Sequence, residues 1–181
     1  MKPDKRLLAD EQAARLFAHD EAVEQAKNLA LRLLTARSRS RGEVIRRLRG
    51  RHFSGQAVQG AVEALERLGL LDDRAFARGW VERRQAARPT GRLGLERELR
   101  EQGVAPDLVA EVLDEMLTDR DPEAEALDLL RTRAARYRGL DREKALGRMY
   151  GLLSRRGFDA ETARAAARRM WQEIEDPSPH L

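Results

Sequence analysis

The chain has 181 residues, of which 41% are hydrophobic, 36% charged and 4% aromatic, and it contains no cysteine. This length suits one ordinary domain or a few small modules, and the few aromatic residues argue against a base-stacking platform. The lack of cysteine excludes disulfides and fits a reducing compartment. No apolar run approaches the roughly 20 residues of a membrane span, and the polar start does not resemble a signal peptide. We therefore expect a soluble, cytoplasmic protein.

A pattern of three helices repeats three times along most of the chain. Residues 1–20 are polar with scattered apolar groups, which leaves open a loosely docked helix or a partly disordered extension. From residue 21 onward, helical stripes recur with a period of about 50 residues. We predict repeats at 21–71, 72–118 and 119–175, followed by a frayed tail at 176–181, because Asp-Pro-Ser-Pro does not continue a helix.

The first repeat carries clear signals for helix starts. A helical stripe covers residues 22–35, and Ser40 with Glu43 has the spacing of a capping box for the second helix. Ser54 is placed to cap the third helix. The apolar face of that helix is expected to be finished by Leu65, Leu68 and Leu70.

A tight corner follows the first repeat. Gly69 is expected to end the helix, since glycine adopts the left-handed conformation without a Cβ clash. Asp72 is expected to cap the next helix and to meet the positive end of its dipole. Phe76 and Trp80 lie four residues apart on one face of that helix, where core packing is the expected role.

The later helix boundaries are marked in the same way. The helix that holds Phe76 is expected to end near Arg88-Pro89, because the residue before proline disfavours helical geometry. The first helix of the third repeat is expected to extend to Tyr137. The remaining helix starts are indicated by Pro106, Asp121, Asp141 and Asp159.

The junction between the second and third helices shows the repeat directly. It reads LRGRHF at 48–53, LREQGV at 99–104 and LSRRGF at 153–158. Glycine precedes the last apolar residue in two of the junctions, and His52 replaces it in the first. Since histidine tolerates a positive φ, we predict a turn role for His52. With no period-two alternation, we predict an all-α fold of three tandem, three-helix, helix-turn-helix-like repeats in an elongated, curved body.

Basic residues recur on equivalent helices of the three repeats. Residues 32–51 hold eight arginines and one acid, residues 74–100 eight arginines and three acids, and residues 131–169 twelve basic residues and four acids. For any single arginine, a solvated surface position is the simpler interpretation. The recurrence predicts a basic strip for a phosphate backbone or an acidic protein groove. The candidate residues are Arg37, Arg39, Arg41, Arg46, Arg47, Arg83, Arg84, Arg92, Arg97, Arg100, Arg155, Arg156, Arg168 and Arg169.

No motif indicates an enzyme or a cofactor. The sequence lacks GxxxxGK[ST] and GxGxxG, and its three histidines are scattered without a zinc-ligand spacing. An autonomous DNA-binding regulator with tandem helix-turn-helix modules remains an alternative, as does a helical scaffold. The expected third helices of the first two repeats are acidic, with Glu63, Glu66, Glu111 and Asp114, which disfavours readout of the major groove. The third repeat departs from this, since Arg164, Arg168 and Arg169 make its last helix basic.

The repeats resemble the RecX family, the bacterial modulators of the RecA recombinase, over residues 25–172. The resemblance is carried by Ser38 to Arg41 before Leu48, by Leu68 to Asp73 with Phe76-Ala77, by Leu140-Asp141, by Tyr150 to Leu153, and by Arg156 to Phe158. His52 departs from the usual glycine and affects turn geometry only. The extension at residues 1–20 lies outside the match.

The resemblance implies a protein without catalytic residues that acts on a partner. Similar proteins bind in the groove of the RecA filament on DNA, limit its extension, and reduce ATP hydrolysis, strand exchange and coprotease activity during DNA repair and the SOS response. Many also bind DNA weakly without sequence preference. We accordingly expect a monomeric inhibitor whose groove-facing surface includes the candidate arginines.

Overall fold

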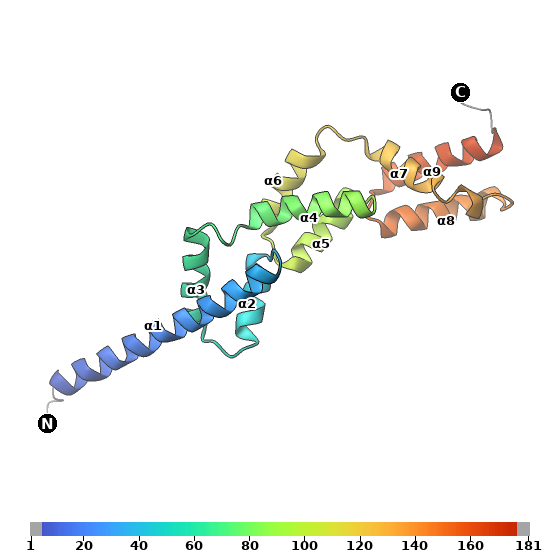
Figure 1. The fold of residues 1–181 in the computed structure, drawn as a ribbon. Helices are drawn as coiled ribbons and strands as arrows, with labels where there is room; N and C mark the ends of the chain where they lie inside the picture. Colours follow the sequence, from blue (N-terminus) through green and yellow to red (C-terminus); the bar gives the residue numbers. More distant parts are fainter. Residues whose placement is uncertain (1–4, 177–181) are drawn as a thin grey trace. The chain divides into compact units, whose positions relative to one another are not determined.

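A computed structural model describes residues 5–176, with side chains described from residue 16. This part of the chain is helical and contains no strand (Figure 1), which confirms the all-α class. The helices are α1 (Lys5–Ala36), α2 (Arg41–Arg49), α3 (Gly55–Arg67), α4 (Asp73–Ala87), α5 (Arg92–Gln102), α6 (Pro106–Leu117), α7 (Pro122–Arg131), the 3-10 helix η1 (Ala134–Arg136), α8 (Arg142–Arg155) and α9 (Ala160–Glu175). The expected frayed tail lies, apart from Asp176, outside the described residues.

The helices form two compact units. The first unit runs to Phe76 and includes the short segment Gln102–Val104. The second unit contains Ala77–Glu101 and the chain from Ala105 onward. The division falls within α4, and each unit has its own buried residues.

The predicted helix caps are present. Ser40 Oγ accepts a hydrogen bond from the backbone N–H of Glu43 at 3.0 Å, and Ser54 Oγ accepts one from Ala57 at 3.2 Å. The aspartates at the other predicted starts accept in the same way from backbone N–H groups two or three residues ahead. These aspartates are Asp72, Asp121, Asp141 and Asp159. Each cap satisfies an orphan donor of the first helical turn.

Asp159 shows how strongly such a cap holds its carboxylate. The Thr162 hydroxyl donates to Oδ2 at 2.6 Å, and the Thr162 backbone N–H donates to Oδ1 at 2.9 Å. The hydroxyl bond, followed by the backbone bond, lowers the pKa of Asp159 from its ordinary value. The cap is therefore charged at neutral pH and faces the positive end of α9.

Two helix boundaries differ from the sequence prediction. The first helix was expected over 22–35, but α1 is continuous from Lys5. The first helix of the third repeat was expected to reach Tyr137, but α7 ends at Arg131 and η1 follows. Tyr137 is nevertheless buried, because the 3-10 turn returns its side chain to the core that the helical stripe had indicated.

The first unit has a core between α1, α2 and α3. Ala26, Ala30, Val44, Leu48 and Leu65 belong to one buried cluster, which Leu71 closes. Leu68 and Leu70 were also expected on the apolar face of the third helix. This prediction is wrong, since Leu68 is 65% and Leu70 is 50% exposed. The reason is that Gly69 adopts φ 66° and turns the chain, so that the side chain buried after the turn is that of Leu71.

A buried carboxylate ties the loop before α2 to its first turn. Glu43 is 6% exposed, and its Oε1 accepts from Arg39 Nη1 and from Arg37 Nη2. Arg39 Nε also donates to the Leu33 carbonyl at 2.9 Å, and its side chain is only 9% exposed. The expected capping box is thus half right: Ser40 caps α2, but the Glu43 side chain binds two arginines.

The predicted turns between second and third helices share one backbone conformation. The φ angle is 65° at His52, 88° at Gly103 and 75° at Gly157. The turn role predicted for His52 is therefore confirmed. Each of these residues stands one position before a partly or fully buried apolar residue, which the turn brings back toward a core.

At two of these turns the backbone is in direct contact with the start of another helix. The start of α2 contacts the turn at Gly103, and the start of α5 contacts the turn at Gly157. In the first unit, Ser40 Oγ donates to the Gln102 carbonyl at 2.5 Å, and a Cβ on Gly42 would lie 2.6 Å from the Gly103 oxygen. In the second unit, Gly91 donates to the Arg156 carbonyl at 2.9 Å. These contacts require glycine, because any side chain would separate the two backbones.

The second unit has a buried hydrophobic cluster between α7, α8 and α9. α9 packs against both α7 and α8 (Figure 1). The packed side chains form one cluster that includes Leu130, Met149, Leu153, Phe158 and Trp171. Both tryptophans of the chain, Trp80 and Trp171, lie in this unit, so their fluorescence reports on its unfolding.

We predict that Gly157→Ala strongly destabilises the second unit. A Cβ on Gly157 would lie 2.0 Å from the Gly94 nitrogen, and φ is 75°. Gly139 has a similar φ of 78° with nothing within 4 Å, so Gly139→Ala measures the conformational cost alone, about 1–2 kcal/mol. Urea unfolding followed by tryptophan fluorescence should show a loss larger by about 2 kcal/mol or more for Gly157→Ala. Equal losses would contradict the backbone contact.

We predict that Glu43→Ala destabilises the first unit by about 3–5 kcal/mol, because it leaves the buried Arg39 without its counterion. Arg37 has a side chain that is 52% exposed, so Arg37→Ala should cost no more than about 1 kcal/mol. Urea unfolding followed by circular dichroism measures both. Similar losses for the two variants would show that Glu43 acts as a surface ion pair.

Candidate interaction surface

The candidate arginines of the first unit are mostly engaged within it. Arg37 and Arg39 bind Glu43, as described above. Arg41 Nε lies 2.9 Å from Glu66 Oε1, and Arg46 Nη2 donates to the Gln102 carbonyl at 3.1 Å. Arg47 is exposed, and its side chain has no ion pair or hydrogen bond among residues 16–176. Of these five positions, Arg47 has the guanidinium most open to a partner, and the buried Arg39 has the least open.

The candidate arginines on α4 and α5 also include both paired and unpaired side chains. Arg92 Nη2 lies 2.7 Å from Asp114 Oδ1, and Arg100 Nη2 lies 4.0 Å from Glu96 Oε2. Arg83 and Arg97 are exposed, and neither has an ion pair in the described part of the second unit. Both can therefore meet an anionic partner without first breaking an internal contact.

Arg84 belongs to a cluster with the half-buried Trp80. Its Nε lies 2.5 Å from Glu98 Oε2, and its guanidinium carbon lies 5.6 Å from the centre of the indole ring. Trp80 Nε1 donates to the same carboxylate oxygen at 3.1 Å. The core role predicted for Trp80 is thus only partly correct, since the indole also takes part in a cation–π and hydrogen-bond cluster.

The remaining candidates lie on α8 and α9. Arg155 and Arg168 are exposed, and Arg168 Nε donates to the Arg164 carbonyl at 3.3 Å. Arg169 Nη1 lies 3.8 Å from Glu123 Oε1. Arg156 is half-buried at the end of α8, where burial and then the charges of neighbouring arginines lower its pKa. Those neighbours include Arg88 and Arg133, which line a cavity of about 420 Å³ together with Arg156.

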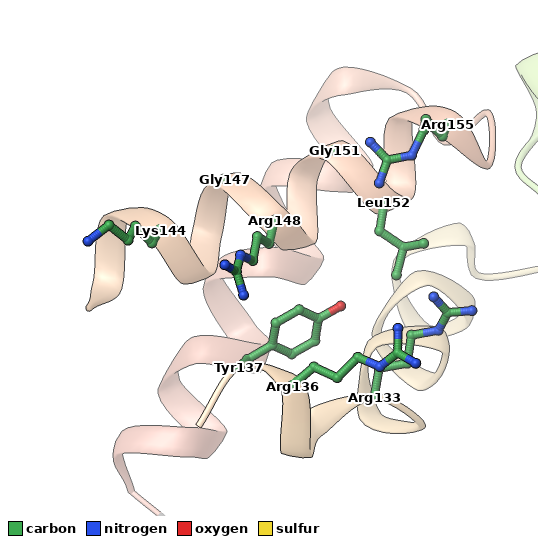
Figure 2. Close-up of a pocket in the computed structure, with 9 residues that line it drawn as sticks. All are labelled: Arg133, Arg136, Tyr137, Lys144, Gly147, Arg148, Gly151, Leu152 and Arg155. Atoms are coloured by element: carbon green, nitrogen blue, oxygen red, sulfur yellow. The ribbon is translucent and has the colours of Figure 1, made fainter. Parts of the chain in front are cut away.

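A second cavity concentrates cationic residues that the sequence analysis did not single out (Figure 2). It measures about 570 Å³ and lies between η1 and α8. Its lining residues are Arg133, Arg136, Tyr137, Lys144, Gly147, Arg148, Gly151, Leu152 and Arg155. Of these residues only Arg155 was a candidate, because the sequence does not show that side chains of η1 and α8 gather around one cavity. The basic excess of residues 131–169 was the signal for this region, but it did not identify the side chains.

The chemistry that these surfaces offer is binding of anions. Among the described residues, no group of three histidine, aspartate or glutamate side chains could hold a metal ion. In the same part of the chain, none of the helices has the length and apolarity that crossing a bilayer requires.

The sequence matches two family models. These are the first three-helix domain of RecX, over residues 26–68, and its second three-helix domain, over residues 72–113. The two matches meet at the corner formed by Gly69 and Asp72.

Curated relatives and solved structures agree with these matches. The regulatory protein RecX of Streptomyces coelicolor is 36% identical over 161 residues, which cover 89% of this chain and 85% of that protein. The regulatory protein RecX of Thermobifida fusca is 34% identical, with 90% and 89% covered. The crystal structure of RecX from Lactobacillus salivarius has the same fold, with a TM-score of 0.73 at 20% identity, over 86% of this chain and 98% of that one. The chain therefore belongs to the RecX family of regulatory proteins.

Proposed function

We propose that the protein binds the RecA filament on DNA, in its helical groove, and limits filament extension, ATP hydrolysis, strand exchange and coprotease activity. The observation that carries this proposal is the match to RecX regulatory proteins along nearly the whole chain. A regulator of this kind acts through binding surfaces.

Unpaired arginines supply the polar part of such a contact. Arg47, Arg83 and Arg97 are exposed without an ion pair in the described residues. An arginine that is free in the unbound protein meets an acidic partner at a lower cost than one that must leave an internal carboxylate. We therefore place these three ahead of Arg39 and Arg92 as groove-facing residues.

Exposed leucines at the corner supply an apolar part. Leu68 and Leu70 flank Gly69 and are 65% and 50% exposed. They belong to the same segment on which the family resemblance is strongest. Exposed leucines are common on protein surfaces, but two at a corner fixed by a positive φ form a preorganised contact, which favours a protein partner over DNA alone.

An autonomous reader of DNA sequence is less well supported. The third helices α3 and α6 expose carboxylates at Glu63, Glu66, Asp107, Glu111 and Asp114. In a helix-turn-helix reader, the corresponding helix would enter the major groove. These carboxylates would there meet phosphates of the same sign.

We predict that Arg83→Glu combined with Arg97→Glu weakens binding to cognate RecA filaments by about tenfold or more, because two unpaired cations become anions. Labelled protein is titrated against filaments on single-stranded DNA with a non-hydrolysable ATP analogue. Wild-type protein should bind the filament more tightly than the same DNA without RecA at equal salt.

The matched control is Arg67→Glu combined with Arg138→Glu, which reverses two exposed arginines outside the candidate set. Equal weakening by the two pairs would show that only net charge matters. Equal or tighter binding of wild-type protein to bare DNA would favour the autonomous DNA-binding regulator. A Leu68→Ser, Leu70→Ser variant tests the apolar contact in the same assay.

A further inference from the structure

The cavity between η1 and α8 gathers positive charge without a carboxylate among its lining residues. Arg133, Arg136, Arg148 and Arg155 have no side-chain hydrogen bond or ion pair within residues 16–176, whereas Lys144 pairs with Asp141 at 3.0 Å. Elsewhere in this chain, arginines such as Arg84, Arg92 and Arg131 are paired with acids. Four unpaired guanidinium groups around one hollow repel one another, so an anion in that hollow would relieve an unfavourable arrangement.

Tyr137 supplies a polar atom inside this charge cluster. The residue is only 4% exposed, yet its hydroxyl has no hydrogen-bond partner in the described part of the chain. Figure 2 shows the phenol ring between α8 and the arginines of η1, with its oxygen directed into the cavity. Burial raises the pKa of Tyr137 although Arg133 and Arg136 act in the opposite direction. The hydroxyl therefore remains a hydrogen-bond donor at neutral pH.

Two glycines on α8 leave part of the cavity wall without side chains. Gly147 and Gly151 lie one turn apart on α8 and line the cavity. Glycine within a helix costs about 1 kcal/mol relative to alanine, and no packing explains it at Gly147, where a Cβ would meet nothing within 4 Å. Their effect is to let a ligand approach the helix backbone closely.

We propose that this cavity is a binding site for neighbouring phosphate groups, as a nucleoside polyphosphate or a nucleic-acid strand carries them. Arg133, Arg136 and Arg148 bind phosphate oxygens, the Tyr137 hydroxyl donates a further hydrogen bond, and the face with Gly147 and Gly151 accepts the sugar or base. The volume of about 570 Å³ is of the size that holds one small ligand.

The charge of the site selects phosphates over carboxylates. One carboxylate carries a single charge and fits one guanidinium fork, whereas adjacent phosphates place several charges and many acceptor oxygens within one hollow. The Tyr137 ring is buried, so it does not serve as a stacking platform. Recognition therefore rests on charge and hydrogen bonding, and we expect little base preference.

The test uses the full chain without RecA, so its outcome is independent of the proposed function. Binding of a labelled oligothymidylate is measured by anisotropy at several salt concentrations, and ATP and inorganic phosphate are added as competitors. Arg136→Ala with Arg148→Ala should weaken binding about tenfold or more and reduce the slope of log K against log salt by about 1.4, since each lost phosphate contact on a single strand removes about 0.7.

Two further variants separate the cavity from general charge. Arg138→Ala with Arg142→Ala removes two exposed cations that do not line the cavity, and it should weaken binding much less. Gly147→Leu should fill the cavity and weaken binding about tenfold without lowering the midpoint of urea unfolding, because leucine favours the helix.

Competition identifies the source of the phosphates. Displacement of the oligonucleotide by ATP at equal nucleotide concentration assigns the site to a free nucleotide, and persistence of the bound strand assigns it to nucleic acid. Either result supports a phosphate site in this cavity if the cavity variants abolish the binding. Equal losses for the cavity pair and the control pair, or unchanged binding by Gly147→Leu, would overturn the proposal.

Discussion

The close approach of backbone to backbone at the turns between second and third helices is the constraint on which this fold depends. Gly157 combines a positive φ with van der Waals contact to Gly94, and Gly103 does the same against Gly42. Because no side chain separates the two segments, hydrogen bonds such as Gly91 to Arg156 join them directly. A small core with few aromatic residues is thereby supplemented by contacts that tolerate almost no substitution.

These turns also determine where arginines can act. Arg46 donates to the carbonyl of Gln102 at one turn, and Arg156, next to Gly157, is held half-buried at another. An arginine held in this way is less available to a partner. Arg83 on α4, Arg97 on α5 and Arg136 of η1 are different, because they are exposed and have no ion pair among the described residues. A regulator that acts by binding requires both kinds of arginine, and residue type alone does not separate them.

Much of the fold was predictable because the determining signals are local. The caps at Ser40, Ser54 and Asp159 depend on residues within one helical turn, and the positive φ at His52 follows from its position in a repeated junction. The site was less predictable. No local pattern distinguishes Arg39 from Arg47. In the structure, however, the buried Glu43 binds Arg39, whereas Arg47 is exposed. Arg133 and Arg136 were missed because their grouping with Arg148 depends on the packing of η1 beside α8, which no local pattern indicates.

The sequence by itself determined the all-α class, the helix starts and the family, because capping, proline and glycine effects and the spacing of apolar residues act over short distances along the chain. Tertiary structure decided which side chains are free. Leu70 is exposed and Leu71 is buried because Gly69 turns the chain between helices. Tyr137, Arg136 and Arg148 surround one cavity because η1 packs beside α8. Burial and pairing depend on residues distant in sequence, and only the packed helices bring those together.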